Sequence, residues 1–224
     1  MTLTERHPSL PYVIPFAVFL AALAIFPKLG LPDRVEFPLR ILLLIAVLAV
    51  FSRKVISFRV VAPVTTVMMG IAVFALWVAP DLLIPGWRQH WLFQNSILGT
   101  VSSSLSESAK SDSFVLALRT FRAVVLVPII EELFWRAWLL RWLINPDFRK
   151  VSPGAYTAQS FWLSAVLFAS EHGPYWDVGL VAGMAYNWWM YRTKSLGDLI
   201  LAHAVTNACL CGFVLITGRW EYWL

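Results

Sequence analysis

Long stretches without charge constrain this chain more than any other feature. Residues 60–79 are twenty consecutive uncharged residues, and most of them are apolar. An α-helix of about 20 residues crosses the ~30 Å hydrocarbon core of a bilayer. Only 14% of the chain is charged and 59% is hydrophobic, whereas about a quarter of a soluble domain is charged. The sequence therefore predicts an integral membrane protein of the all-α class.

Further apolar segments occupy residues 9–27, 37–51, 114–143, 155–170, 178–191 and 199–217. Together they predict a polytopic transmembrane helical bundle with about seven or eight membrane helices. The first segment also resembles a secretory signal, because Ala22-Leu23-Ala24 has small residues like those at a cleavage site. The apolar run continues beyond that site to Phe26, which favours a retained membrane helix.

Basic residues gather in short loops, and this indicates how the helices are oriented. The three basic loops carry Arg53, Lys54, Arg59, Arg141, Arg149, Lys150, Arg192 and Lys194. The positive-inside rule places these loops in the cytoplasm together with the N-terminus. The polar connection 80–113 is then external, and residues 87–98 within it can form an interfacial helix. No basic run with interleaved aromatic residues indicates a nucleic-acid groove, so the expected environment is the lipid bilayer and not nucleic acid.

Three charged residues inside the apolar segment 114–143 are the sharpest sign of function. A charge at bilayer depth costs several kcal/mol unless it faces a protein interior or a wet cavity and has a partner. Glu132 and Arg136 are four residues apart, so they can pair on one face of a helix. Glu131 lies about 100° around the helix from Glu132 and is left free to face something else. Pro128, just upstream, removes a backbone hydrogen bond and favours a kink.

Two later apolar segments also carry polar residues at helical spacing. Phe168 and His172 are four apart at the end of one segment, and His203 and Asn207 are four apart within another. Taken alone, the His203–Asn207 pair suits a structural hydrogen bond between helices. His172 alone suits a histidine near the membrane interface, and Glu132 with Arg136 suits a structural ion pair.

Taken together, a carboxylate, two imidazoles and an amide on three helices suit hydrolysis. A carboxylate and an imidazole can hold and deprotonate a water molecule. A second imidazole and an amide can donate to the oxyanion that forms when water attacks a carbonyl. Two histidines and a glutamate also form a common catalytic zinc set, although the His-Glu-x-x-His helix typical of many zinc proteases is absent from the sequence.

The three motifs occur in a fixed order on apolar segments: Glu131-Glu132-x-x-x-Arg136, Phe168-x-x-x-His172 and His203-x-x-x-Asn207. This arrangement resembles the CPBP family, which comprises the type II CAAX prenyl endopeptidases and their bacterial relatives. The resemblance implies an intramembrane protease. It also divides the chain into N-terminal membrane helices with an external loop, residues 1–113, and a catalytic helical core, residues 114–224.

The resemblance implies a role for each motif residue. Glu131 and His172 would activate the attacking water, and His203 and Asn207 would stabilise the oxyanion. The supporting residues would be Glu132, Arg136 and Phe168. No metal is expected; if the enzyme instead depends on zinc, the ligands would be Glu131, His172 and His203.

The resemblance also implies a substrate class and a location. The substrate would be a membrane-associated peptide or lipidated protein, including the prenylated CAAX type, and the expected location is the inner (cytoplasmic) membrane of a bacterium. The same residues are also compatible with a non-catalytic protein of this fold that binds a peptide as an immunity or scaffold protein. A proton-coupled transporter is a third possibility, because buried glutamate and histidine form proton relays.

Overall fold

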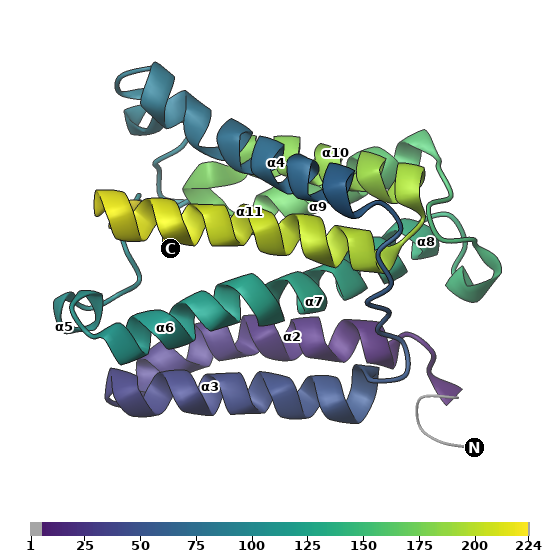
Figure 1. Cartoon of the computed structure of the whole chain (residues 1–224), viewed down its shortest axis with the longest axis horizontal. Helices are drawn as coiled ribbons and strands as arrows, with labels where there is room; N and C mark the ends of the chain where they lie inside the picture. Colours follow the sequence, from purple (N-terminus) through teal and green to yellow (C-terminus); the bar gives the residue numbers. More distant parts are fainter. Residues whose placement is uncertain (1–5, 224) are drawn as a thin grey trace.

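The structure is a computed structural model that describes residues 6–223, and all their regular elements are helical (Figure 1). An isolated bridge between Asn95 and Gly99 accompanies them. The predicted all-α fold is therefore confirmed. The N-terminal helices are α2 (Leu10–Ile25) with its 3-10 extension η1 (Phe26–Leu29), α3 (Asp33–Val47) with its π-helical end η2 (Leu48–Ser52), and α4 (Pro63–Leu83).

The polar connection after α4 contains only short helical turns. They are the 3-10 turn η3 (Trp87–Gln89) and the single-turn helix α5 (Glu107–Lys110). The prediction of an interfacial helix over residues 87–98 is therefore wrong. The Asn95 side chain accepts hydrogen bonds from the backbone N–H groups of Ile97 and Leu98, at 3.0 Å each, and closes a local turn in place of a helix.

The second half of the chain begins with one continuous helix, residues 113–142, which we call the central helix. It consists of α6 (Ser113–Phe121), the π-helical segment η4 (Arg122–Leu126), α7 (Val127–Glu132), the π-helical segment η5 (Leu133–Leu139) and α8 (Leu140–Trp142). The elements that follow are η6 (Phe148–Lys150), α9 (Ala158–Ser170), η7 (Gly173–Tyr175), α10 (Trp176–Thr193), α11 (Leu196–Thr217) and η8 (Trp220–Tyr222).

Five helices in the described part of the chain are long and apolar enough to cross a membrane: Leu10–Leu29, Asp33–Ser52, Pro63–Leu83, Ser113–Trp142 and Leu196–Thr217. With these spans the chain is an integral membrane protein. The apolar helix α9 has 13 residues, which is shorter than the roughly 17–25 residues of a typical span. The count of seven or eight membrane helices is not confirmed and stays a prediction.

The helices form a bundle with the central helix and α11 in its middle. Figure 1 shows α2 and α3 on one side of this pair and α4, α9 and α10 on the other. Helices α4 and α11 approach each other closely, because a Cβ added to Gly70 would lie 2.5 Å from the Ala202 carbonyl oxygen. Small residues at such crossings let two backbones approach closely in membranes.

One carboxylate joins the start of α4 to the start of α11. The fully buried Asp198 accepts hydrogen bonds from the backbone N–H groups of Val61 and Ala62 and from the Thr66 hydroxyl, at 2.8, 3.0 and 2.6 Å. It therefore satisfies donors near the N-terminus of α4 that have no partner within the helix. This contact fixes α11 relative to α4 at one end of the bundle.

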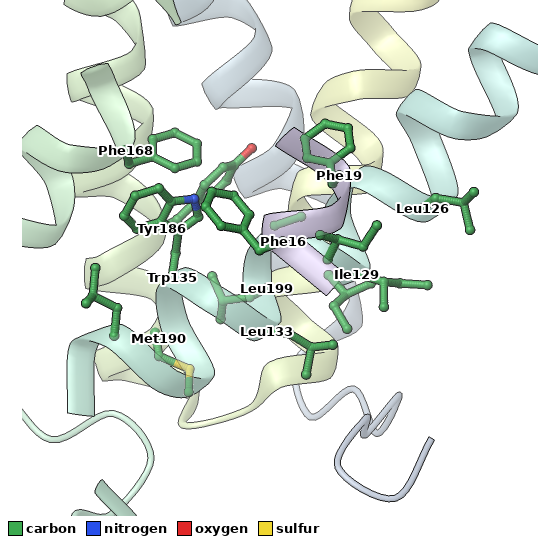
Figure 2. Packing of buried hydrophobic residues seen from close by; sticks show 14 of the residues in the cluster. Phe16, Phe19, Leu126, Ile129, Leu133, Trp135, Phe168, Tyr186, Met190 and Leu199 are labelled. Atoms are coloured by element: carbon green, nitrogen blue, oxygen red, sulfur yellow. The ribbon is translucent and has the colours of Figure 1, made fainter. Parts of the chain in front are cut away.

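The largest apolar cluster lies where α2 meets the central helix. Figure 2 shows Phe16 and Phe19 of α2 in this cluster, near Trp135 of the central helix. The Phe16 ring stacks on Phe134 with the ring centroids 4.0 Å apart and meets Trp135 edge to face. The first membrane helix is thus packed into the core beside the segment that carries the glutamate pair.

Candidate active site

The central helix is distorted on both sides of the glutamate pair, and Pro128 explains the first distortion. Within η4 the Val127 N–H donates to the carbonyl of Arg122, five residues earlier. Residue 128 is a proline and has no N–H to donate. The carbonyl of Ala123 therefore loses its two usual helical donors, Val127 and residue 128. Single π-helical turns of this kind occur frequently at functional sites.

The side chain of Asn207 on α11 supplies the missing donor. Its Nδ2 lies 2.7 Å from the Ala123 carbonyl oxygen. Buried carbonyl groups without a partner are rare because they are costly. The proline in one helix and the asparagine in another thus form a single structural unit, which leaves Asn207 Oδ1 and one Nδ2 hydrogen for other contacts.

Glu132 is fully buried, and its carboxylate contacts two side chains, Arg136 and His203. Its Oε1 atom lies 3.2 Å from Arg136 Nη1 and 2.8 Å from His203 Nδ1. The ion pair with Arg136 is the one that the four-residue spacing predicted. The contact with His203 joins the central helix to α11. An ionised carboxylate only accepts hydrogen bonds, so His203 Nδ1 donates and the opposite ring nitrogen, Nε2, is left for other partners.

Aromatic rings hold this pair on its other sides. The Arg136 guanidinium carbon lies 4.4 Å from the centroid of Phe168 and 5.2 Å from that of Tyr186. The His203 ring stacks on Tyr186 at 5.3 Å with 27° between the planes. Phe168 and Tyr186 come from α9 and α10, so four helices fix the orientation of the Glu132–His203 pair.

His172 lies just beyond the end of α9, and its own helix orients it. Its Nδ1 is 2.8 Å from the Phe168 carbonyl oxygen. A carbonyl oxygen only accepts, so Nδ1 donates and Nε2 is again the free acceptor of the neutral ring. Trp77 of α4 packs edge-on against the ring at 5.1 Å. Gly179 of α10 makes room for it, because a Cβ there would lie 3.2 Å from the imidazole.

Glu131 differs from its neighbour because its carboxylate faces a cavity. Its side chain is buried, and its Oε2 atom has no hydrogen-bond partner within residues 6–223. The cavity has a volume of about 270 Å³, and His172, His203 and Asn207 line it as well. The structure thus brings four predicted site residues from three separate segments to one cavity. Glu132 and Arg136 are not among its lining residues, and Phe168 is.

Other lining residues were not predicted from the sequence. They include Phe19, Leu20 and Leu23 of α2, Trp77 of α4, Arg119 and Arg122 of the central helix, Glu171, Tyr175, Tyr222 and Trp223. Glu171, which precedes His172 in the chain, also reaches this cavity. The α2 and α4 residues belong to no motif, and only the packing of the bundle reveals them.

The donor set does not form a metal cluster. Among the residues that the structure describes, no three His, Cys, Asp or Glu side chains lie close enough together to hold a metal ion. The geometry therefore does not fit zinc bound by Glu131, His172 and His203, and we derive no step through a metal.

Comparison with known proteins agrees with the motifs. Residues 113–209 match the family model described as type II CAAX prenyl endopeptidase Rce1-like. No curated protein and no solved structure matches the chain. The matched segment runs from the start of α6 into α11 and includes Glu131, His172, His203 and Asn207. Over residues 113–209 this integral membrane protein is therefore similar to the Rce1-like type II CAAX prenyl endopeptidases, a family of proteases.

Proposed function

We propose that this protein is an intramembrane endopeptidase that hydrolyses a peptide bond with a water molecule activated by Glu131 and His172. The observation that carries the proposal is the buried, unpartnered Glu131 Oε2 in a cavity that His172, His203 and Asn207 also line. A carboxylate in that position is a suitable acceptor for the proton of an attacking water.

In the proposed reaction the water oxygen attacks the peptide carbonyl carbon and Glu131 takes its proton. His172 Nε2, the free acceptor of that ring, orients the water. Negative charge moves to the carbonyl oxygen of the tetrahedral intermediate. When the intermediate collapses, the C–N bond breaks and the leaving amine takes the proton from Glu131. Water and peptide thus become a carboxylic acid and an amine without any further reactant.

His203 and Asn207 are proposed to stabilise the oxyanion. Because His203 Nδ1 donates to Glu132, its Nε2 can donate only when the ring is an imidazolium. We therefore assign Glu132 a positioning role through His203. Asn207 contributes the Nδ2 hydrogen that the Ala123 carbonyl does not use.

The cavity wall supports a substrate that resides in the membrane. Leu20 and Leu23 of α2 line the cavity, and 41% and 39% of their surfaces are exposed on the outside of the bundle. The cavity therefore reaches the face where lipid chains would lie, and an apolar or prenylated segment is a suitable substrate there. Membrane-associated peptides of the CAAX type are accordingly the first candidates.

The basic loops support a cytoplasmic location for one end of the bundle. Ser195 Oγ donates to the Arg59 carbonyl at 2.7 Å, and a Cβ at Gly154 would lie 2.8 Å from the Lys194 side chain. The three loops thus lie at one end, as the positive-inside rule requires. We propose a bacterial inner membrane with the N-terminus in the cytoplasm, which accessibility of single engineered cysteines to a membrane-impermeant reagent would test.

A cleavage assay in liposomes tests the activity. Fluorogenic peptides of farnesylated CAAX, transmembrane and signal-like types would be incubated with the wild type and the His172→Ala variant, each with and without a chelator. The control is Glu107→Gln, because 89% of that side chain is exposed. We expect cleavage by the wild type and the control, loss in His172→Ala and no chelator effect. Binding without turnover would instead favour an immunity or scaffold protein, and Glu131-dependent solute uptake would favour a transporter.

A further inference from the structure

A second pocket lies at the end of the bundle where α8 ends and α11 begins, at the right in Figure 1. It has a volume of about 500 Å³, and Arg59, Arg141 and Lys194 line it. None of the described residues that line it is Asp or Glu. Three cations from separate segments thus surround one hollow that no carboxylate of its lining neutralises. We call it the basic pocket.

The three cations of the basic pocket also lack carboxylate partners elsewhere. No ion pair among residues 6–223 includes any of them. By contrast, the neighbouring Arg149 and Lys150 both pair with Asp147, at 3.2 and 3.3 Å. The positive-inside rule accounts for basic residues at one end of a bundle. It does not require unpaired cations from three segments to converge on a single pocket.

The backbone around the pocket fixes two of the cations beside each other. Ser195 Oγ donates to the Arg59 carbonyl oxygen at 2.7 Å, and a Cβ on Gly197 would overlap that same oxygen. The segment that carries Arg59 therefore lies directly against the start of α11. A Cβ on Gly154 would lie 2.8 Å from Lys194 Cγ, so the stem of this lysine packs on the loop after α8.

Arg141 has a fixed orientation and spare hydrogen-bonding capacity. Its Nε donates to the Ala137 carbonyl at 2.6 Å, and its guanidinium carbon lies 5.0 Å from the centroid of Phe148. Arginine has five N–H donors, and the Nη groups of Arg141 donate to no acceptor among residues 6–223. Two parallel N–H···O bonds to a phosphate are the typical use of such groups.

Lys194 has a backbone conformation that is unfavourable for lysine. It ends α10 with φ +52°, and within residues 6–223 it is the only residue other than glycine with a positive φ. Glycine is the usual residue at such a position because it has no Cβ. Arg192 already supplies the cation that suits the last turn of α10. The charge of Lys194 is therefore not explained by the helix end, and it points to a ligand.

Aromatic side chains place the basic pocket at the level of the lipid headgroups. Tyr156, Trp188 and Tyr191 are exposed at this end of the bundle, and the rings of Tyr156 and Tyr191 lie 5.8 Å apart. Tyrosine and tryptophan gather where a membrane meets water. From the rim of the pocket a row of exposed apolar residues, three or four positions apart, follows α4: Val61, Val64, Met68 and Ile71.

We propose that the basic pocket binds the phosphate of an anionic phospholipid whose acyl chains lie along the exposed row on α4. Basic pockets between membrane helices on the cytoplasmic side bind anionic headgroups in this way. With the proposed orientation the lipid comes from the cytoplasmic leaflet. The basic pocket shares no lining residue with the cavity at Glu131, so this inference does not depend on the proposed protease function.

The test measures lipid binding to the full chain in detergent by native mass spectrometry, with phosphatidylglycerol and phosphatidylcholine as probes. The variants are Arg59→Gln and Lys194→Gly, and the control is Arg53→Gln, an exposed cation outside the pocket. We expect the wild type and the control to bind phosphatidylglycerol at least about tenfold more tightly than phosphatidylcholine. Each variant should bind phosphatidylglycerol about fivefold more weakly. Equal affinity of the wild type for the two lipids, or an equal loss in the control, would overturn the proposal.

Lys194→Gly separates binding from folding, because glycine suits the backbone at this position. Without phosphatidylglycerol its melting temperature should equal or exceed that of the wild type. Addition of phosphatidylglycerol should raise the melting temperature of the wild type more than that of Lys194→Gly, since a ligand stabilises the state that binds it. An equal rise in both proteins would contradict a role for this cation.

A competition experiment distinguishes a lipid phosphate from a soluble one. Inorganic phosphate or chloride would be added at equal ionic strength to the complex with phosphatidylglycerol, so that screening is the same in both. We expect the two salts to release the lipid equally. Selective release by inorganic phosphate would assign the pocket to a soluble phosphate and overturn the lipid proposal.

Discussion

Two buried Glu–Arg pairs with the same spacing occur among the described residues, Glu36–Arg40 on α3 and Glu132–Arg136 on the central helix. Both are i,i+4 pairs, and both arginines stack on aromatic rings. The difference lies in the third partner. Glu132 also accepts a hydrogen bond from His203 of α11, whereas no hydrogen bond from another helix to Glu36 occurs among residues 6–223. Only the pair that is completed across a helix interface adjoins the proposed reaction centre.

Among the changes that test this comparison of the two pairs, the largest effect is expected when the carboxylate that holds His203 is neutralised. Glu132→Gln removes the carboxylate that accepts from His203 Nδ1 and orients its ring, so the cleavage rate should fall at least about 100-fold. Glu36→Gln, the matched change in the other pair, should leave the rate within about twofold. The cleavage rates of the two variants would be measured with the same peptide in the same preparation of liposomes. A similar loss in the two variants would mean that buried charge alone, and not the contact with His203, determines activity.

The next effect concerns stability. Glu132→Ala leaves Arg136 buried without its partner, which costs about 3–5 kcal/mol. Replacing both members by apolar residues, Glu132→Met with Arg136→Leu, should recover most of that free energy of unfolding but none of the activity. Unfolding in mixed detergent micelles would be followed by tryptophan fluorescence. Recovery of activity in the double variant would remove Glu132 from the mechanism.

A smaller effect is expected where the backbone makes room for His172. In Gly179→Ala the new Cβ would lie 3.2 Å from the imidazole, so the ring must shift by a few tenths of an ångström. The cleavage rate should fall about tenfold because the reacting groups are misplaced. Gly212→Ala on α11 is the matched control, since nothing lies within 4 Å of a Cβ there. An unchanged rate in Gly179→Ala would argue against a role for His172 in the reaction.

The smallest effect comes from an exposed pair at the membrane surface, Arg34 with Asp112. The hydrogen bond from Arg34 holds the pKa of Asp112 below its ordinary value. A lowered carboxyl pKa stabilises the fold above the ordinary pKa of about 3.9, and the contribution is lost as the pH falls below it. Between pH 7 and pH 3 the melting temperature should fall slightly more steeply in the wild type than in Arg34→Gln. Identical profiles would mean that the pair contributes nothing.

Helical spacing was sufficient to predict the motif residues and one of their contacts. Four-residue intervals placed Glu132 with Arg136 on one face and separated Glu131 from them. Apolar runs predicted the membrane segments, although α3 begins at Asp33, earlier than the expected residue 37. These features depend on local periodicity, which is why one sequence is enough to find them.

Contacts between helices could not be predicted in the same way. The approach of His203 to Glu132, the support of the Ala123 carbonyl by Asn207, and the position of Trp77 against His172 all depend on how distant segments pack. The π-helical turns on either side of α7 also shift the register of the central helix. The lining of the cavity by Arg119 and Arg122 is therefore visible only in the folded bundle.

The most direct test of the account is peptide cleavage by the Glu131→Gln variant beside the wild type. The variant should bind the peptide with unchanged affinity and cleave it at least about 1,000-fold more slowly, because the group that accepts the proton from water is gone. The Glu36→Gln variant should cleave at the wild-type rate, and a chelator should change neither result. Cleavage by Glu131→Gln at a rate close to that of the wild type would contradict the central claim that this carboxylate activates the water.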